Sequence, residues 1–292
     1  MRNTATAEKI DGPLERIGKI ISGTSHMMGS GFTAHHFSEE MFEGRMDPLL
    51  MVDHFVMTAP TFEPHLHAGI SAVTVMFEDS RGAFLNRDTL GRNVALKAGD
   101  LYWLAAASGA AHEEKPEEGA RTHALQIFVN LPARLKMEPA RALHVPAQEV
   151  PVLQGQGHRV RVVLGRSGTA VGAEGTPQEM TMLDGFLERD GCFAHHLREG
   201  RQAWIYAVSG GLTVCVQGEA HALEAGSATT VGAGPEAEVM LAATEPAHFV
   251  LMAAQPIREP FVKHGPLVMS TAADVRRTLA GYAEGRLGRV PT

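Results

Sequence analysis

Cysteines, basic clusters and long apolar runs are all scarce in this chain. Its 292 residues include two cysteines, Cys192 and Cys215, and both lie in apolar or strand-like segments. We therefore expect two buried core thiols in a reducing compartment, and no disulfide scaffold. Acidic residues outnumber basic ones, the formal net charge is −7, and no compact cluster of lysine and arginine occurs. This balance argues against direct contact with nucleic acid.

No apolar run approaches the ~18 residues of a membrane-spanning helix. Charged residues, Lys9, Asp11, Glu15 and Arg16, interrupt the N-terminal segment, which lacks the apolar stretch of a secretory signal. We therefore expect a soluble, cytoplasmic protein without a membrane partner. The length suffices for two domains, each with its own core.

Several common catalytic motifs are also absent. The sequence has no Gly-x-Ser-x-Gly for a hydrolase nucleophile and no Gly-x-x-x-x-Gly-Lys-Ser/Thr for a phosphate-binding loop. Gly155 and Gly157 are not followed by a third glycine at the required spacing, which excludes the dinucleotide-binding fingerprint.

Short apolar runs separated by glycine, proline and aspartate indicate β-strands. The runs span residues 73–77, 94–96, 101–104, 125–129, 204–208, 212–216 and 249–253. Ser209-Gly210-Gly211 between two of these runs is typical of a hairpin. Helical periodicity is scarce, so the pattern predicts an all-β protein built as a sandwich or barrel.

Prolines bracket a segment without strand-like alternation, residues 130–139, and recur at Pro146 and Pro151. Such a segment is typical of a linker. We place the domain boundary near residue 147, so that residues 1–147 and 148–292 would each form one barrel of about eight to ten strands.

One helix is predicted near the C-terminus. Thr271 can cap it, and Asp274 stands three residues later as the partner of a capping box. Val275, Leu279 and Tyr282 would then share one face, which we expect to pack against a sheet.

Four residues in the first half have the spacing of metal ligands. Side chains two apart on a strand point to the same face, so His65 and His67 can reach one ion. The same period pairs His112 with Glu114 and turns Glu113 outward. Two such pairs on neighbouring strands would supply three imidazoles and one carboxylate, which suits Fe, Mn, Ni, Cu or Zn. Histidines on the surface are the alternative interpretation.

The remaining histidines carry weaker signals. His35-His36 and His195-His196 are adjacent pairs, and neighbours on a strand face opposite ways, so neither pair chelates an ion alone. His123 precedes a strand and could line the same cavity or hydrogen-bond a ligand. His264 is expected to be structural.

Several motifs in a fixed order suggest a family. They are Asp47-Pro-Leu-Leu-Met-Val-Asp53-His54-Phe55, Pro64-His65-Leu66-His67-Ala68-Gly69, Arg87-Asp88-Thr-Leu-Gly91, Gly99-Asp100-Leu-Tyr-Trp103, Gly109-Ala-Ala-His112-Glu113-Glu114, His123-Ala-Leu-Gln126-Ile-Phe-Val-Asn130-Leu-Pro132 and Arg258-Glu259-Pro260-Phe-Val-Lys-His264-Gly265-Pro266-Leu-Val-Met269-Ser270-Thr271. Over roughly residues 45–282, the chain resembles the pirin family of the cupin superfamily.

The resemblance implies two cupin β-barrels of the jelly-roll type in tandem, with a short C-terminal helix. It implies one metal in the N-terminal barrel, held by His65, His67, His112 and Glu114. The C-terminal barrel is expected to be free of metal, because His195 and His196 are not matched by a later Gly-x-x-His.

The chain departs from the family near the His-x-His pair. Many relatives carry arginine and glutamate where this sequence has Ala68 and Ser71. Residues 105–109, Ala-Ala-Ala-Ser-Gly, also replace a stretch that contains arginine in the family. We expect charge to be lost at the mouth of the pocket, which favours an apolar ligand.

The resemblance implies a dioxygenase that opens flavonols such as quercetin with O2. One divalent transition metal, with Fe(II) preferred over Mn, Ni, Cu or Zn, would be the cofactor, and a small apolar or aromatic molecule the substrate. Glu114 would be both ligand and catalytic base, accepting the proton of the flavonol hydroxyl.

A regulatory function is the alternative. Eukaryotic pirins resemble metal-dependent transcription cofactors, and this chain would then be a metal- or redox-dependent module that binds another protein. Its acidic balance suits a basic protein partner. A stress protein with an adventitious metal is a third possibility.

Overall fold

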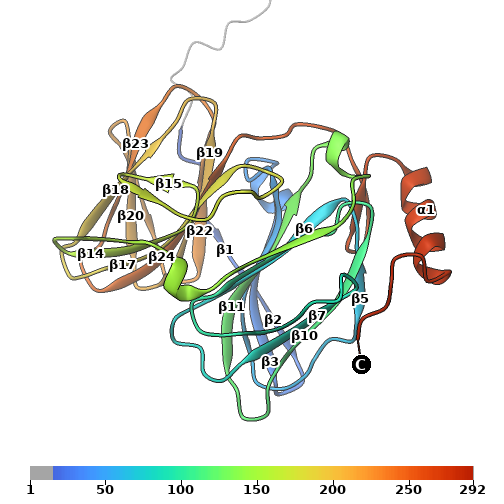
Figure 1. Cartoon of the computed structure of the whole chain (residues 1–292). Helices are drawn as coiled ribbons and strands as arrows, with labels where there is room; N and C mark the ends of the chain where they lie inside the picture. Colours follow the sequence, from blue (N-terminus) through green and yellow to red (C-terminus); the bar gives the residue numbers. More distant parts are fainter. Residues whose placement is uncertain (1–15, 292) are drawn as a thin grey trace, which may run out of the picture.

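A computed structural model describes residues 16–291, and β-strands form most of this part of the chain. The strands build two units that lie side by side (Figure 1). Each unit contains a seven-stranded and a four-stranded sheet, so it is a two-sheet jelly roll rather than a closed barrel. The predicted all-β fold with two such units and a C-terminal helix is confirmed.

The first unit uses mainly the N-terminal half of the chain. Its seven-stranded sheet contains, in spatial order, β12 (Arg141–Val145), β9 (Leu101–Ala105), β6 (Ile70–Met76), β11 (Thr122–Asn130), β4 (Leu49–Met57), β3 (Phe32–Ser38) and β2 (Thr24–Met28). Its four-stranded sheet contains β5 (His65–His67), β10 (Ala110–Pro116), β7 (Phe84–Asp88) and β8 (Asn93–Leu96). Apolar side chains from both sheets form one core between them.

The second unit repeats this plan. Its seven-stranded sheet contains β1 (Ile21–Ser22), β22 (Ser227–Val231), β19 (Gln202–Ser209), β24 (Ala247–Ala254), β17 (Met180–Leu187), β14 (His158–Leu164) and β13 (Val152–Gly155). Its four-stranded sheet contains β18 (Cys192–Leu197), β23 (Ala237–Ala242), β20 (Leu212–Val216) and β21 (Glu219–Leu223). A second core fills the space between these sheets.

Short elements complete the fold. They are the hairpins β15 (Arg166–Ser167) with β16 (Ala170–Val171) and β25 (Val262–His264) with β26 (Leu267–Met269), the 3-10 turns η1 (Glu39–Phe42), η2 (Ala133–Leu135) and η3 (Ala147–Glu149), and the helix α1 (Ala272–Ala283). No helix among the described residues is both long and apolar enough to cross a bilayer.

The two units pack through their seven-stranded sheets. A third core joins them and contains Val73 and Ile127 from the first unit with Trp204, Tyr206 and Met252 from the second. Residues of these sheets are therefore buried on both faces, which explains the continuous apolar runs in the sequence.

Each end of the described chain crosses to the other unit. β1 pairs with β22 of the second unit, whereas β26 and α1 return to the first unit beside β5, where Ala68 bridges Leu267. Figure 1 shows this return in red. The domain boundary near residue 147 stays a prediction, since strand exchange at both ends means that no single cut separates the units.

Residues 204–208 and 212–216 are strands, but the predicted hairpin between them is wrong. β19 pairs with β22 and β24, whereas β20 pairs with β21 and β23 in the facing sheet. The chain crosses between sheets at Ser209–Gly211, with Gly210 at a φ of 71°. β19 lies inside the seven-stranded sheet of the second unit and is buried on both faces. Its two neighbours are therefore β22 and β24, and not the next strand in the sequence, β20.

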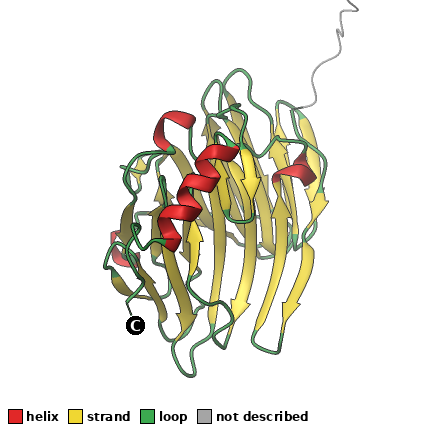
Figure 2. Ribbon diagram, turned by 90° about the vertical axis from the view of Figure 1, so that its right-hand side faces the viewer, coloured by secondary structure: helices red, strands yellow, loops and turns green. Residues whose placement is uncertain are grey.

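The predicted helix cap is confirmed, because the Thr271 side chain accepts a hydrogen bond from the Asp274 backbone N–H. The predicted apolar face is wrong in part. Val275 is buried, but Leu279 is 38% and Tyr282 36% exposed. The helix lies across the outer surface of the strands (Figure 2). Its buried face includes the small residues Thr278 and Gly281, because the turn at Gly109 closely approaches Thr278.

Neither cysteine is a buried core thiol, so that prediction is also wrong. Cys192 is exposed and Cys215 half-buried, and both are free. The alternation of β18 gives the inward position to Phe193, and that of β20 gives it to Val214 and Val216. Both cysteines therefore take the outward positions of their strands.

Candidate metal centre

Two neighbouring strands position the predicted ligand pairs. β5 runs antiparallel to β10, with His65 opposite His112 and His67 opposite Ala110. Alternation on β10 places Glu114 on the same face as His112 and turns Glu113 away, where its carboxylate accepts a hydrogen bond from Lys115. The pairing that the sequence predicted for the two strands is therefore present.

The three imidazoles converge on one point. Their ring centroids are 4.8 to 4.9 Å apart in every pair, and their candidate ligand atoms all lie within 4.8 Å of one another. The Nε2 atoms of His67 and His112 are 3.1 Å apart. Two nitrogens bound at right angles to one ion at 2.0–2.1 Å would be about 3.0 Å apart, so this spacing fits a shared metal ion.

Burial keeps His67 and His112 neutral. It lowers the pKa of His67 to about 3, with a further contribution from His65, and holds the pKa of His112 well below its ordinary value. The Nδ1 of His65 lies 2.9 Å from the carbonyl of Glu63, which leaves Nε2 with a free lone pair when Nδ1 donates. Neutral imidazoles are the form that binds a metal, so the donor set suits an ion without losing protons from these rings.

Glu114 lies beside the histidine cluster and outside it. Its Oε2 is 4.0 Å from Nδ1 of His112, and its Oε1 accepts a 2.6 Å hydrogen bond from the Thr74 hydroxyl. Burial raises the pKa of Glu114 to about 7, although the Thr74 hydrogen bond opposes the rise. A carboxyl group with this pKa can take up or release a proton at neutral pH.

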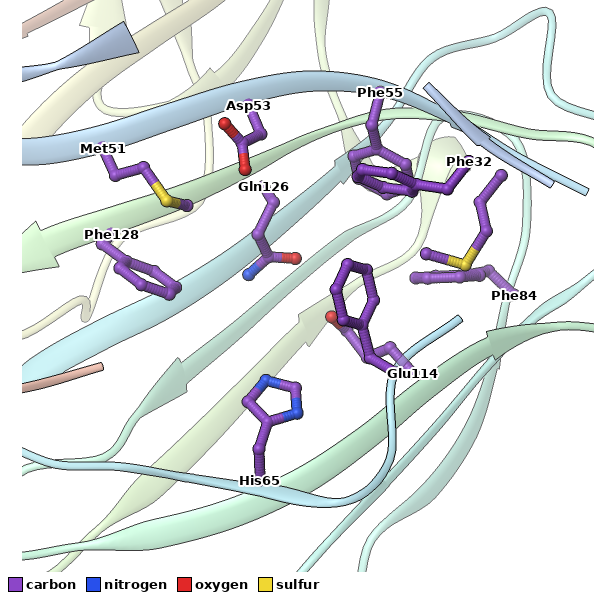
Figure 3. A pocket seen from close by; sticks show the side chains of 11 residues that line it. Phe32, Met51, Asp53, Phe55, His65, Phe84, Glu114, Gln126 and Phe128 are labelled. Carbon is purple, nitrogen blue, oxygen red and sulfur yellow. The ribbon is translucent and has the colours of Figure 1, made fainter. Parts of the chain in front are cut away.

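The cluster adjoins a cavity of about 160 Å³, which His65 lines. Its lining is mainly aromatic and thioether, with three polar exceptions besides His65 (Figure 3). The lining residues are Phe32, Met51, Asp53, Phe55, Met57, Phe62, His65, Phe84, Glu114, Gln126 and Phe128. An apolar cavity with a few convergent polar groups is the usual form of a small-molecule site.

Asp53 and Gln126 are pocket residues that the sequence analysis did not select. Both stand at inward positions of strands that are mainly apolar, β4 and β11. That break in an apolar run was a usable signal. It could not show which face the residues take, because these strands are buried on both sides.

His123 does not line this cavity, so that prediction is wrong. It lies on the opposite face of β11 from Gln126, at the junction of the units. Its Nε2 is 2.6 Å from Nε2 of His54, and its Nδ1 is 2.6 Å from Oδ1 of Asp79. Gln126 stands three positions after His123, and strand alternation sends side chains at an odd offset to different faces.

The prediction that Ala68 and Ser71 lie at the pocket mouth is wrong. Ala68 is fully buried in a small core with Leu267, Met269 and Val275. Ser71 is also fully buried, on the face of β6 opposite to Thr74. The loss of charge at these positions therefore leaves the lining of the pocket unchanged.

The other histidine pairs lie apart from the cluster. His36 pairs with Asp53, and His35 is near His54 at the junction of the units. His195 lies opposite Val239 and is buried, with its Nδ1 3.0 Å from the Ser167 hydroxyl. His264 is exposed on β25. A C-terminal unit without metal stays a prediction.

Family models match two parts of the chain. The model described as Pirin matches residues 17–129, and the model described as Pirin C-terminal cupin domain matches residues 182–288. A curated protein of Pseudomonas aeruginosa named "Putative quercetin 2,3-dioxygenase" is 34% identical over 256 residues, covering 83% of this chain and 87% of that protein. The chain belongs to the pirin family.

Solved structures of related proteins share the pirin fold. The crystal structure of quercetin 2,3-dioxygenase from Acinetobacter baumannii is 27% identical, has a TM-score of 0.80, and is matched over 92% of this chain and 97% of that chain. Bacterial pirin YhhW from Escherichia coli, solved in complex with nickel(II), is 19% identical with a TM-score of 0.61, covering 82% of this chain and 99% of that chain. At this identity the second match supports the fold alone.

Proposed function

We propose that this pirin binds one divalent transition metal through His65, His67, His112 and Glu114, and that it oxidises a small aromatic substrate of the flavonol class with O2. Fe(II) is the preferred ion. The observation that carries the proposal is the cluster of three imidazoles beside an apolar, aromatic-lined cavity, next to a carboxyl group whose pKa is about 7.

Two relatives support the proposed activity. A similar solved structure carries the name quercetin 2,3-dioxygenase, and a curated relative carries the name "Putative quercetin 2,3-dioxygenase". Glu114 would complete the ligand set by a rotation of its side chain toward the imidazoles, since it now stands beside them. Three imidazoles and one carboxylate suit several divalent ions.

The bound ion would act as a Lewis acid toward a substrate oxygen and would supply the redox centre for oxygen chemistry. Glu114 would remove the proton of the flavonol hydroxyl. The O–H bond breaks, the proton passes to Oε2, and the electron pair stays on the substrate oxygen. Thr74 donates a hydrogen bond to the other carboxylate oxygen, Oε1, which leaves Oε2 to accept the proton.

The aromatic lining would have two tasks. The rings of Phe32, Phe55 and Phe84 line the cavity and offer flat surfaces to a planar ligand, since aromatic pairs favour stacked or edge-to-face contact. They also exclude water, which strengthens the interactions of Glu114 with a bound hydroxyl.

The test combines metal content with oxygen uptake. Protein reconstituted with Fe(II) or Ni(II) is mixed with quercetin, and oxygen consumption is followed for the wild type, His112→Ala and His264→Ala. We expect uptake in the wild type, no uptake and no metal in His112→Ala, and no change in His264→Ala, which removes an exposed histidine outside the site.

Metal bound at one equivalent without oxygen uptake or flavonol binding would contradict the enzymatic proposal. The regulatory alternative, in which the metal controls binding of a protein partner, would then be preferred.

A further inference from the structure

A row of polar residues crosses the seven-stranded sheet of the first unit in a single register. His36 lies opposite Asp53, Asp53 opposite Gln126, Gln126 opposite Thr74 and Thr74 opposite Tyr102. Residues directly opposite on neighbouring strands point to the same face of a sheet. The whole row therefore lies on the inner face, and Asp53 and Gln126 line the cavity.

Asp53 keeps one oxygen available to the cavity. Its Oδ1 is 2.6 Å from Nδ1 of His36, and this contact raises the pKa of the His36 imidazole. The other oxygen, Oδ2, makes a hydrogen bond to no residue within 16–291. Asp53 therefore presents a carboxylate oxygen with unused acceptor capacity at the wall of an apolar pocket.

Gln126 supplies the complementary group. Its Oε1 is 3.1 Å from the Thr74 hydroxyl, while its Nε2 has no hydrogen-bond partner in the described part of the chain. The amide therefore offers a donor beside the Asp53 acceptor. A hydroxyl group both donates one hydrogen bond and accepts others, so a single hydroxyl can satisfy both residues.

We propose that Asp53 and Gln126 form a second polar subsite that binds a ligand hydroxyl remote from the metal-binding end of the substrate. Figure 3 shows Asp53 and Gln126 on one side of the pocket and His65 on the other, with aromatic side chains around them. This inference deepens the proposed function and rests on it. Asp53 is a specificity-determining residue, and the substrate is a planar aromatic molecule with hydroxyls at both ends.

The test compares two ligands that differ in their remote hydroxyls. 3-Hydroxyflavone carries only the hydroxyl beside its carbonyl, whereas quercetin has further hydroxyls on both outer rings. Their Kd values are measured by absorbance or fluorescence with Ni(II)-loaded protein in the absence of oxygen, so that no turnover occurs. The variants are Asp53→Ala and, as control, Asp79→Ala.

Asp79 is a matched control because it also lies 2.6 Å from a histidine Nδ1, that of His123, and lies outside the cavity. We expect the wild type to bind quercetin more tightly than 3-hydroxyflavone. Asp53→Ala should weaken quercetin binding about tenfold or more, the usual effect of losing a hydrogen bond to a charged group. It should change 3-hydroxyflavone binding less than about twofold, and Asp79→Ala should keep the wild-type preference.

Two results would overturn the subsite. In one, Asp53→Ala keeps the wild-type preference for quercetin. In the other, it weakens both ligands equally, which would mean that Asp53 acts through the fold or the metal site. A failure of the proposed function gives a different result. The metal-loaded wild type would then bind neither flavonol, which would contradict the proposed substrate class itself.

Discussion

Replacing Glu114 by glutamine should stabilise the metal-free protein at pH 8 and not at pH 5. The pKa of Glu114 is raised from 4.5 to about 7 in the folded protein. Between these values the folded protein binds a proton that the unfolded chain has released. The free energy of unfolding therefore falls as the pH rises from about 4.5 to 7, and the full loss persists above pH 7.

The magnitude follows from the same two values. The gap between 4.5 and about 7 corresponds to about 3 kcal/mol at ~1.36 kcal/mol for each pH unit. Glutamine carries no charge to desolvate, and its oxygen can keep the hydrogen bond from Thr74. The variant should therefore gain up to about 3 kcal/mol at pH 8 and little at pH 5, where the folded wild type is already neutral at this position.

Urea denaturation of protein freed of metal by a chelator measures this difference at both pH values. Glu113→Gln serves as the control, because Glu113 lies on the face of β10 opposite to Glu114 and accepts a hydrogen bond from Lys115. Added Fe(II) or Ni(II) should reverse the order at pH 8, since the wild type gains more from binding the ion than the variant does. An equal change in unfolding free energy at pH 5 and pH 8 would contradict a raised pKa of Glu114 in the folded protein.

Three further substitutions test how the site is supported. Lys136→Met removes a buried ammonium that donates to the carbonyls of Gly69 and Val268 and to Asn130. The acceptors left without a partner should lower the unfolding free energy by about 3 kcal/mol or more, measured by urea denaturation. A loss below about 1 kcal/mol would contradict this. Gly69→Ala should prevent folding or metal binding, because its Cβ would lie 1.9 Å from the Val268 carbonyl oxygen at a φ of 71°; normal metal content and melting temperature would show that β26 can move aside. Thr271→Ala should cost about 1 kcal/mol in stability through loss of the helix cap, whereas Thr271→Ser should retain most of it.

The pairing of the two ligand strands could be predicted from the sequence. His65 and His67 share a face by the period of a strand, as do His112 and Glu114, and glycine turns at Gly91 and Gly99 allow the chain to return. These are local rules, and they hold because β5 and β10 each have one face toward the cavity. The sequence did not predict that Glu114 lies outside the histidine cluster. Its position depends on the hydrogen bond from Thr74, which belongs to the facing sheet.

Other features depend on contacts between distant parts of the chain. The seven-stranded sheets are buried on both faces, so apolar alternation does not show which face of β11 takes His123 and which takes Gln126. The polar row through Asp53 and Gln126 becomes visible only when the register of β3, β4, β11 and β6 is known. The crossing after Ser209 likewise depends on which strands flank β19.

Metal analysis of protein purified without an affinity tag, beside His67→Ala, is the decisive test of the three-histidine metal centre. We expect about one equivalent of a divalent transition metal per wild-type chain and almost none in a folded His67→Ala. Little metal in both proteins, with no uptake of added Fe(II) by a folded wild type, would contradict the assignment of the three histidines as a metal centre.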